Sequence, residues 1–167
     1  MPDHPRRLLW TDDDGRERFM FECHLLTKGG WIVDWAHDVY EALEKLGASR
    51  YGAMLLDQML PLGGRRPEAV PETTPWGGYE VLWRLRRASH RHNKAPPFAP
   101  AEGQAGWPEP LDGNVGIPVL IISAFYDEDV LAAMRGASVH DRDLVISPKP
   151  TNIDEINDFL DGFEGHP

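Results

Sequence analysis

Apolar and polar residues are arranged along the chain in blocks that suit two kinds of secondary structure. Short runs of consecutive apolar residues are separated by longer segments whose apolar residues lie three or four positions apart, as on one face of a helix. The runs predict strands at 6–11, 31–36, 51–57, 117–124 and 143–147. The helical spacing predicts helices at 15–30, from Asp38 through Leu46, at 78–88, at 128–135 and at 154–163. Strands and helices therefore alternate, which is typical of an α/β fold with a mainly parallel sheet.

Two of the predicted strands, 51–57 and 117–124, are apolar at nearly every position. Such continuous runs favour strands that are covered on both faces of the sheet. The predicted fold class is therefore α/β, a doubly wound, five-stranded parallel sheet with helices on both faces. At the start of the second predicted helix, Asp38 followed by Glu41 makes an acidic variant of a capping box.

Two segments interrupt the alternation and carry no periodic pattern. They span about 62–77 and about 95–116, are rich in proline and glycine, and are longer than the usual connections within an α/β domain. Neither repeats nor a second domain are visible, so residues 1–167 are interpreted as a single domain with two insertions. Trp76 and Trp107 lie within the insertions and are expected to anchor these loops on the domain or to contact a partner.

Composition and charge exclude several classes of protein. The 167 residues are 41% hydrophobic and 26% charged, an ordinary mixture for a globular protein. A net charge of −10 argues against a nucleic-acid-binding surface, because contacts with phosphates require cationic side chains. The basic segment 84–94 is interpreted as the solvated carboxyl end of a helix. No apolar run is long enough to span a membrane, and the amino terminus lacks the apolar core of a signal peptide.

The chain has a single cysteine, Cys23, which cannot form an intramolecular disulfide and so agrees with a reducing compartment. It falls within the apolar pattern of the first predicted helix, and we therefore expect a buried structural thiol rather than a reactive one. The predicted location of the protein is the cytoplasm.

Polar residues with complementary chemistry follow four of the predicted strands. These residues are Asp12, Asp13 and Asp14 after the first strand, Asp57 at the end of the third, Ser123 at the end of the fourth and Lys149 after the fifth. Ligands of an open parallel sheet bind at the carboxyl ends of its strands, so these side chains are expected to converge at one edge. Crowded carboxylates repel one another and require a cation, and hard oxygen ligands suit Mg²⁺. Asp14 is the member most readily explained as a helix cap.

A magnesium site beside a hydroxyl and an ammonium group is equipped to hold a phosphoryl group. The ion would neutralise phosphoryl oxygens, Lys149 would contribute a point charge and Ser123 would donate a hydrogen bond. Asp57 is therefore the candidate nucleophile, which would form an acyl phosphate. Each residue alone is more simply explained as a surface or strand-end residue, and only their combination favours the site.

This combination resembles the receiver domain of two-component response regulators, the CheY-like superfamily, over nearly the whole chain outside the two insertions. The acidic pair of that family corresponds to Asp12 and Asp13 in LLWTDDD, and its phosphoacceptor corresponds to Asp57 in LLDQMLP. Its switch hydroxyl corresponds to Ser123 in LIISA, and its lysine corresponds to Lys149 in SPKP. The resemblance implies a flavodoxin-like (CheY-like) sheet and a single receiver domain over 1–167.

The resemblance also implies a further metal ligand, the backbone carbonyl of Met59. The sequence departs from the family at the usual aromatic switch position, three residues before the lysine, where it has Ile146. The first insertion directly follows the phosphoacceptor loop, where it is expected to restrict access of water or of a partner to the site. The second insertion lengthens the approach to the fourth strand.

The function that the resemblance implies is that of a stand-alone receiver, a phosphorylation-dependent signalling switch. Asp57 would accept a phosphoryl group from a histidine kinase or a phosphotransfer protein in the presence of Mg²⁺. A downstream protein, which the sequence does not identify, would bind the altered surface, and homodimer formation stays open. Nucleic acid and membrane are not expected partners. The protein would not be an enzyme, although it would assist transfer and hydrolysis of its own phosphoryl group.

Two other functions are weighed against this one. A receiver-like protein-interaction module that works without phosphorylation is suggested by Ile146 and by the insertion beside Asp57, but the intact acidic, hydroxyl and lysine positions argue against it. A phosphohydrolase of the haloacid dehalogenase type would need a second aspartate two residues after the nucleophile, where this chain has Met59.

Overall fold

The computed structural model describes residues 6–13, 16–63, 74–86, 107–124, 127–137, 144–148 and 152–164. Within them the strands are β1 (Arg7–Thr11), β2 (Ile32–Ala36), β3 (Ala53–Asp57), β4 (Val119–Ser123) and β5 (Leu144–Pro148). They form one five-stranded sheet in the order β2-β1-β3-β4-β5. Every neighbouring pair is parallel, which confirms the predicted sheet.

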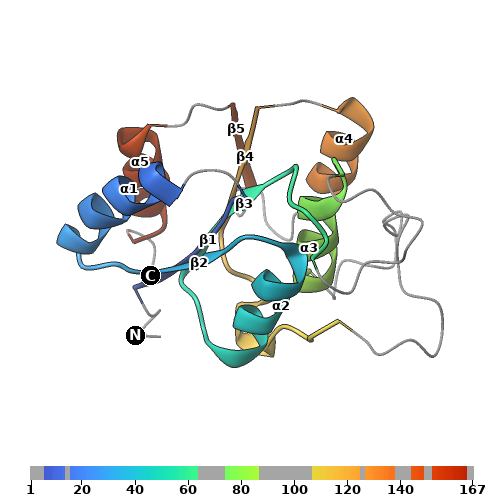
Figure 1. Cartoon of the computed structure of the whole chain (residues 1–167), viewed down its shortest axis with the longest axis horizontal. Coiled ribbons are helices and arrows are strands. Elements are labelled where there is room, and N and C mark those ends of the chain that lie inside the picture. Colours follow the sequence, from blue (N-terminus) through green and yellow to red (C-terminus); the bar gives the residue numbers. More distant parts are fainter. Residues whose placement is uncertain are drawn as a thin grey trace.

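Helices cover both faces of the sheet, so the predicted doubly wound arrangement is confirmed. The helices are α1 (Arg16–Lys28), α2 (Val39–Ala48), α3 (Gly77–Leu85), α4 (Glu128–Gly136) and α5 (Ile153–Glu164). Figure 1 shows α1 and α5 on one side of the sheet and α2, α3 and α4 on the other. None of the helices in the described part of the chain is long and apolar enough to cross a membrane.

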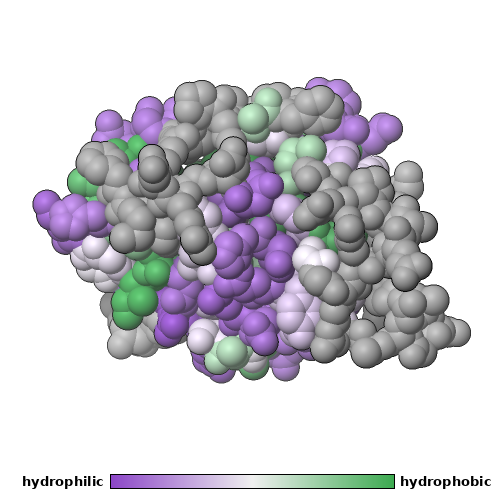
Figure 2. Space-filling model, viewed as in Figure 1, coloured by the Kyte–Doolittle hydropathy of each residue, from purple (hydrophilic) through white to green (hydrophobic). Residues whose placement is uncertain are grey.

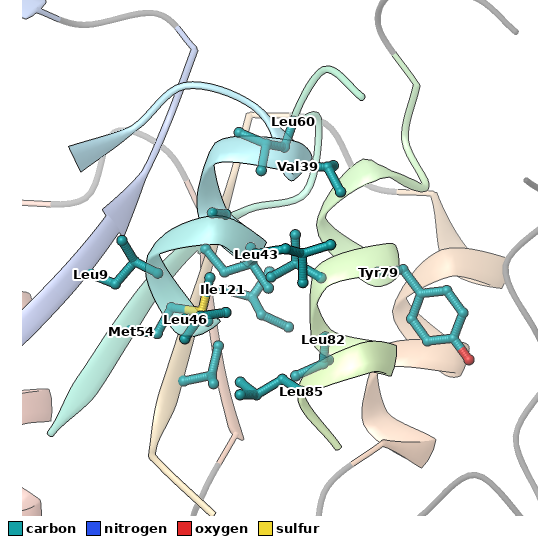
Figure 3. Packing of buried hydrophobic residues seen from close by; sticks show 14 of the residues in the cluster. Leu9, Val39, Leu43, Leu46, Met54, Leu60, Tyr79, Leu82, Leu85 and Ile121 are labelled. Atoms are coloured by element: carbon teal, nitrogen blue, oxygen red, sulfur yellow. The ribbon is translucent and has the colours of Figure 1, made fainter. Parts of the chain in front are cut away.

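Each face of the sheet contributes to its own apolar core. Figure 3 shows part of the larger core, where strand residues such as Leu9, Met54 and Ile121 meet Leu43 of α2 and Leu82 of α3. The smaller core is formed by Leu8, Trp10, Leu55, Leu120 and Ile122 of the strands with Leu26, Ile156, Phe159 and Leu160 of the helices. Successive residues of a strand point to opposite faces, and helices cover both faces of this sheet. The central strands β3 and β4 are therefore buried along their whole length.

Side chains cap several helices where the sequence offers an acceptor. Asp38 caps α2 by accepting a hydrogen bond of 2.7 Å from the backbone nitrogen of Glu41, as predicted. The Glu41 carboxylate accepts from the backbone nitrogen of His37, one residue before the expected donor. At α5 the Asn152 side chain accepts from the backbone nitrogen of Glu155. The sequence also offers Thr151, three residues before Asp154, as a cap for this helix, and Thr151 lies outside the described residues.

The end of the second insertion packs against the domain. Trp107 is 7% exposed and belongs to the larger core, close to Tyr40 of α2 and beneath the guanidinium of Arg84. Arg86, just after α3, is fully buried and donates hydrogen bonds to the carbonyls of Val115 and Ile117. The interpretation of 84–94 as a solvated helix end is therefore wrong for Arg86, because its buried guanidinium satisfies the carbonyl of Val115 in the insertion and that of Ile117 just after it.

The remaining expectations from the sequence have mixed outcomes. Cys23 is half-buried rather than fully buried, and burial raises the pKa of its thiol. Residues 64–73 and 87–106, which make up much of the two insertions, lie outside the described residues. Whether the first insertion restricts access to Asp57 therefore stays a prediction.

Candidate functional site

Three carboxylates from two neighbouring strands meet at the carboxyl edge of the sheet. Asp12 and Asp13 follow β1 and Asp57 ends β3, and one oxygen of each lies within 4.8 Å of the others. Asp12 is 8% exposed and Asp57 is 2% exposed, whereas Asp13 is exposed to solvent. The residues are far apart in the sequence but close in space because β1 pairs with β3.

Backbone and hydroxyl groups hold the two strand ends in place. The backbone nitrogen of Asp12 donates to the carbonyl of Ala36 at the end of β2, at 3.1 Å. Between β1 and β3, the Thr11 hydroxyl donates to the Leu55 carbonyl at 3.1 Å and accepts from the Asp57 backbone nitrogen at 3.2 Å. These contacts fix the positions from which the three carboxylates project.

The Asp57 carboxylate is itself oriented by the loop that follows it. Its Oδ1 accepts a hydrogen bond of 2.9 Å from the backbone nitrogen of Met59. A hydrogen bond to the ionised form stabilises a carboxylate that is almost completely removed from solvent. The backbone carbonyl of Met59 is the further metal ligand that the resemblance implies.

The amino end of α3 packs directly against this loop. The Gly78 backbone nitrogen donates to the Gln58 carbonyl at 3.1 Å. A Cβ atom at Gly78 would lie 2.3 Å from the carbonyl oxygen of Asp57, and one at Gly77 would lie 1.7 Å from that of Leu60. Both glycines are therefore needed for the close approach of α3 to the Asp57 loop. We did not anticipate this role, although the Gly-Gly pair before an apolar helical pattern was a visible signal.

The structure also brings Ser123 to the same edge. Ser123 ends β4, is fully buried, and follows Ile122, the residue paired with Asp57. Lys149 comes immediately after β5 and lies outside the described residues, as does Asp14. The structure therefore brings together Asp12, Asp13 and Asp57, with Ser123 at the end of the adjacent strand.

Gln58 is a second neighbour of the site that we did not anticipate. Its side chain is fully buried, and neither its amide nitrogen nor its amide oxygen has a hydrogen-bond partner among the described residues.

Ile146, at the position where the receiver family usually has an aromatic residue, is half-buried on β5 and packs against the larger core. The described part of the chain therefore has an aliphatic contact where an aromatic switch would lie.

The chemistry of the donor set fits a divalent cation. The three closely spaced side chains all offer carboxylate oxygens, and the described residues place no histidine or cysteine with them. Hard oxygen donors of this kind suit Mg²⁺, which commonly binds through one or two carboxylates together with water. Without a cation the three negative charges repel one another at close range.

Comparison with known proteins bears on the fold. No protein-family model matches the sequence, and no curated protein matches it. Among solved structures, the receiver domain of the Francisella response regulator 1452 is 20% identical, with a TM-score of 0.58 and 94% of each chain covered. The Vibrio cholerae chemotaxis protein CheY4 is 18% identical, with a TM-score of 0.61 over 94% of this chain and 97% of that one.

A third solved structure shares the same arrangement of strands and helices. It is the receiver domain of the sensor histidine kinase PA1611 from Pseudomonas aeruginosa, with a magnesium ion coordinated in the active site cleft. This domain is 16% identical, with a TM-score of 0.61 over 97% of this chain and 99% of that one. The observed strand order is the one expected of a flavodoxin-like sheet. The chain therefore has the fold of a CheY-like response-regulator receiver domain.

Proposed function

We propose that this protein is a phosphorylation-dependent signalling switch that accepts a phosphoryl group on Asp57. The observation that supports this most strongly is the convergence of Asp12, Asp13 and Asp57 within 4.8 Å, at the carboxyl edge of a receiver fold. The expected donors are a histidine kinase or a phosphotransfer protein, and the expected reader of the signal is another protein. Neither nucleic acid nor a membrane is part of the proposal.

In the proposed reaction a carboxylate oxygen of Asp57 forms a bond to phosphorus. The bond between phosphorus and the histidine nitrogen of the donor breaks, and that nitrogen takes up a proton from solvent. The product is an acyl phosphate on Asp57. The hydrogen bond from the Met59 backbone nitrogen to Oδ1 orients the carboxylate for this step.

Asp12, Asp13, Asp57 and the Met59 carbonyl would hold Mg²⁺, which neutralises charge on the phosphoryl oxygens when bound. The magnesium ion in the cleft of the PA1611 receiver domain supports this assignment by analogy. Ser123 would donate its hydroxyl to a phosphoryl oxygen, and Lys149 would supply a positive charge. The domain would act on its own phosphoryl group and not as an enzyme that turns over a separate substrate.

Intact mass spectrometry tests the proposal directly. Wild type and Asp57→Asn are incubated with Mg²⁺ and a small phosphodonor such as acetyl phosphate, and then with a phosphorylated histidine kinase. We expect a single phosphoryl adduct on the wild type alone, lost when the metal is chelated beforehand. Lys149→Ala should weaken the downstream response even where some phosphate is taken up. Uptake by the Asp57→Asn variant would contradict the assignment.

Ile146 favours one alternative function, a receiver-like interaction module that works without phosphorylation. An aliphatic side chain packed into the larger core has no aromatic ring to reorient when a phosphoryl group arrives. No adduct on the wild type with either donor would support this alternative.

A further inference from the structure

Thr11 makes the last cross-strand contact before the acidic cluster. It pairs with Leu56 in the final register position shared by β1 and β3. Its hydroxyl lies between the two peptide groups that flank Leu56, donating to the Leu55 carbonyl and accepting from the Asp57 nitrogen. Thr11 is completely buried, so water does not compete for these hydrogen bonds.

The residues immediately beyond this contact repel one another. Asp12 and Asp13 follow Thr11 directly, and their carboxylates lie within 4.8 Å of the Asp57 carboxylate. Like charges at this distance favour separation of the strand ends that carry them. A side-chain contact at the last rung of the ladder opposes that separation, and it joins the residue before the acidic pair to the backbone of Asp57 itself.

We propose that Thr11 is a positioning residue that holds Asp57 at a defined distance from the Asp12 and Asp13 pair. The inference rests on the proposed function for its effect on phosphoryl transfer, but not for its effect on the backbone of Asp57. A valine at this position would fill the same space and would leave the packing of β1 against β3 nearly unchanged. It would remove both hydroxyl contacts, and the carboxylates would then adopt a wider range of separations.

Two matched pairs of residues at position 11 isolate the hydroxyl group. Threonine and valine have nearly the same volume and differ in the hydroxyl, and so do serine and alanine at a smaller volume. The full chain is prepared as wild type, Thr11→Val, Thr11→Ser and Thr11→Ala. Stability is measured by urea unfolding, the rate of phosphoryl uptake is measured at several Mg²⁺ concentrations, and exchange of the Asp57 amide proton is followed by NMR spectroscopy.

We expect the hydroxyl, and not the volume of the side chain, to decide the function-related measurements. Uptake should be about tenfold slower in the variant without the hydroxyl within each pair, because small displacements of reacting groups have large effects on rate. The Asp57 amide proton should exchange faster in the same two variants. Unfolding midpoints should instead fall with the loss of volume as well as with the loss of the two buried hydrogen bonds. Thr11→Ser should therefore be less stable than the wild type while its uptake rate stays close to that of the wild type.

Each outcome decides between positioning and simple packing. Uptake rates and Asp57 amide exchange that agree within twofold between the members of each pair would overturn the proposal. If one variant fails to fold, the other pair still provides the comparison. If the wild type takes up no phosphate, the proposed function fails, and exchange of the Asp57 amide proton alone decides whether Thr11 holds this residue.

Discussion

At the scale of single residues, the Asp34 side chain on β2 links β1 to the segment just before β3. Its Oδ2 accepts hydrogen bonds from Arg7 Nε at 2.6 Å and from the Tyr51 hydroxyl at 2.8 Å. The Arg7 guanidinium also lies 5.7 Å from the centre of the Tyr51 ring. Partial burial would raise the pKa of Asp34, but the two hydrogen bonds and the charge of Arg7 outweigh it and hold that pKa below its usual value.

The lowered pKa of Asp34 predicts a pH-dependent effect of removing the Tyr51 hydroxyl. Asp34 contributes stability above its unfolded-state pKa of about 4, and this contribution is lost as the pH falls through the lower folded-state value. Tyr51→Phe should lower the free energy of unfolding by about 1 kcal/mol near neutral pH. The difference from wild type should shrink at acidic pH, because the variant has less of this contribution to lose. Urea unfolding at neutral and acidic pH measures both effects.

A double-mutant comparison isolates the carboxylate. In an Asp34→Asn background, which has no titrating group at this position, Tyr51→Phe should have an effect that does not change over the acidic range. The same pH dependence in both backgrounds would show that another group is responsible.

At the scale of elements, the second insertion contributes one side chain, that of Asn114, which links the end of α2 to the segment just before β3 by hydrogen bonds. The side-chain nitrogen of Asn114 donates to the carbonyls of Leu46 and Ser49, each at 2.8 Å. Its side-chain oxygen accepts from the backbone nitrogen of Tyr51 at 2.9 Å. The last carbonyls of a helix have no partners within the helix, and this fully buried amide supplies one for Ser49 and, together with the Leu111 backbone nitrogen, for Leu46.

Asn114→Ala should therefore destabilise the fold strongly without affecting the site. Three backbone groups lose a side-chain partner, although the Leu46 carbonyl keeps its hydrogen bond from the Leu111 backbone nitrogen, and we expect the free energy of unfolding to fall by about 2–3 kcal/mol. Asn152→Ala, which removes an exposed helix cap, is a suitable control and should cost about 1 kcal/mol. Asn114 lies near the amino end of β3, opposite the edge that carries Asp57, so the folded variant should take up phosphate at the wild-type rate. Equal losses of stability in the two variants would argue against a bracing role.

At the scale of the whole molecule, negative charge is the main electrostatic feature. The chain has a net charge of −10, and hydrophilic residues occupy the middle of the face seen in Figure 2. The three clustered carboxylates concentrate part of this charge at one edge of the sheet. Folding therefore brings together groups that repel one another, and a bound cation would relieve the repulsion.

This repulsion predicts that neutralising Asp13 stabilises the metal-free protein and reduces the further stabilisation by Mg²⁺. In the presence of a chelator, Asp13→Asn should raise the melting temperature, because it removes one of three repelling charges. In millimolar Mg²⁺ the wild type should gain stability and the variant should gain less, because a ligand that binds the folded state more weakly stabilises it less. Thermal unfolding in both conditions tests this expectation. Asp158→Asn removes an exposed charge on α5 and leaves the three clustered carboxylates intact, so it should gain as much stability in Mg²⁺ as the wild type does. Equal gains for Asp13→Asn and wild type would contradict a metal site at Asp13.

The periodic pattern of the sequence was sufficient to predict the elements and their type. Strand β3 was predicted at 51–57 and observed at Ala53–Asp57, and α3 was predicted at 78–88 and observed at Gly77–Leu85. Such agreement is expected where apolar periodicity is strong, because the burial of one face selects the secondary structure. The order of the strands did not follow from the pattern. It was implied by the resemblance of four short motifs to one family and is now observed.

The sequence by itself determined which polar residues stand at the ends of the strands, because a carboxylate directly after an apolar run is visible in the sequence alone. Only the tertiary structure decided that Asp12 and Asp13 lie beside Asp57, since this depends on the pairing of β1 with β3. The same holds for the hydroxyl contacts of Thr11, the close approach of Gly78 to the Asp57 loop and the burial of Arg86. Each of these depends on contacts between residues distant in the chain, and local periodicity carries no information about such contacts.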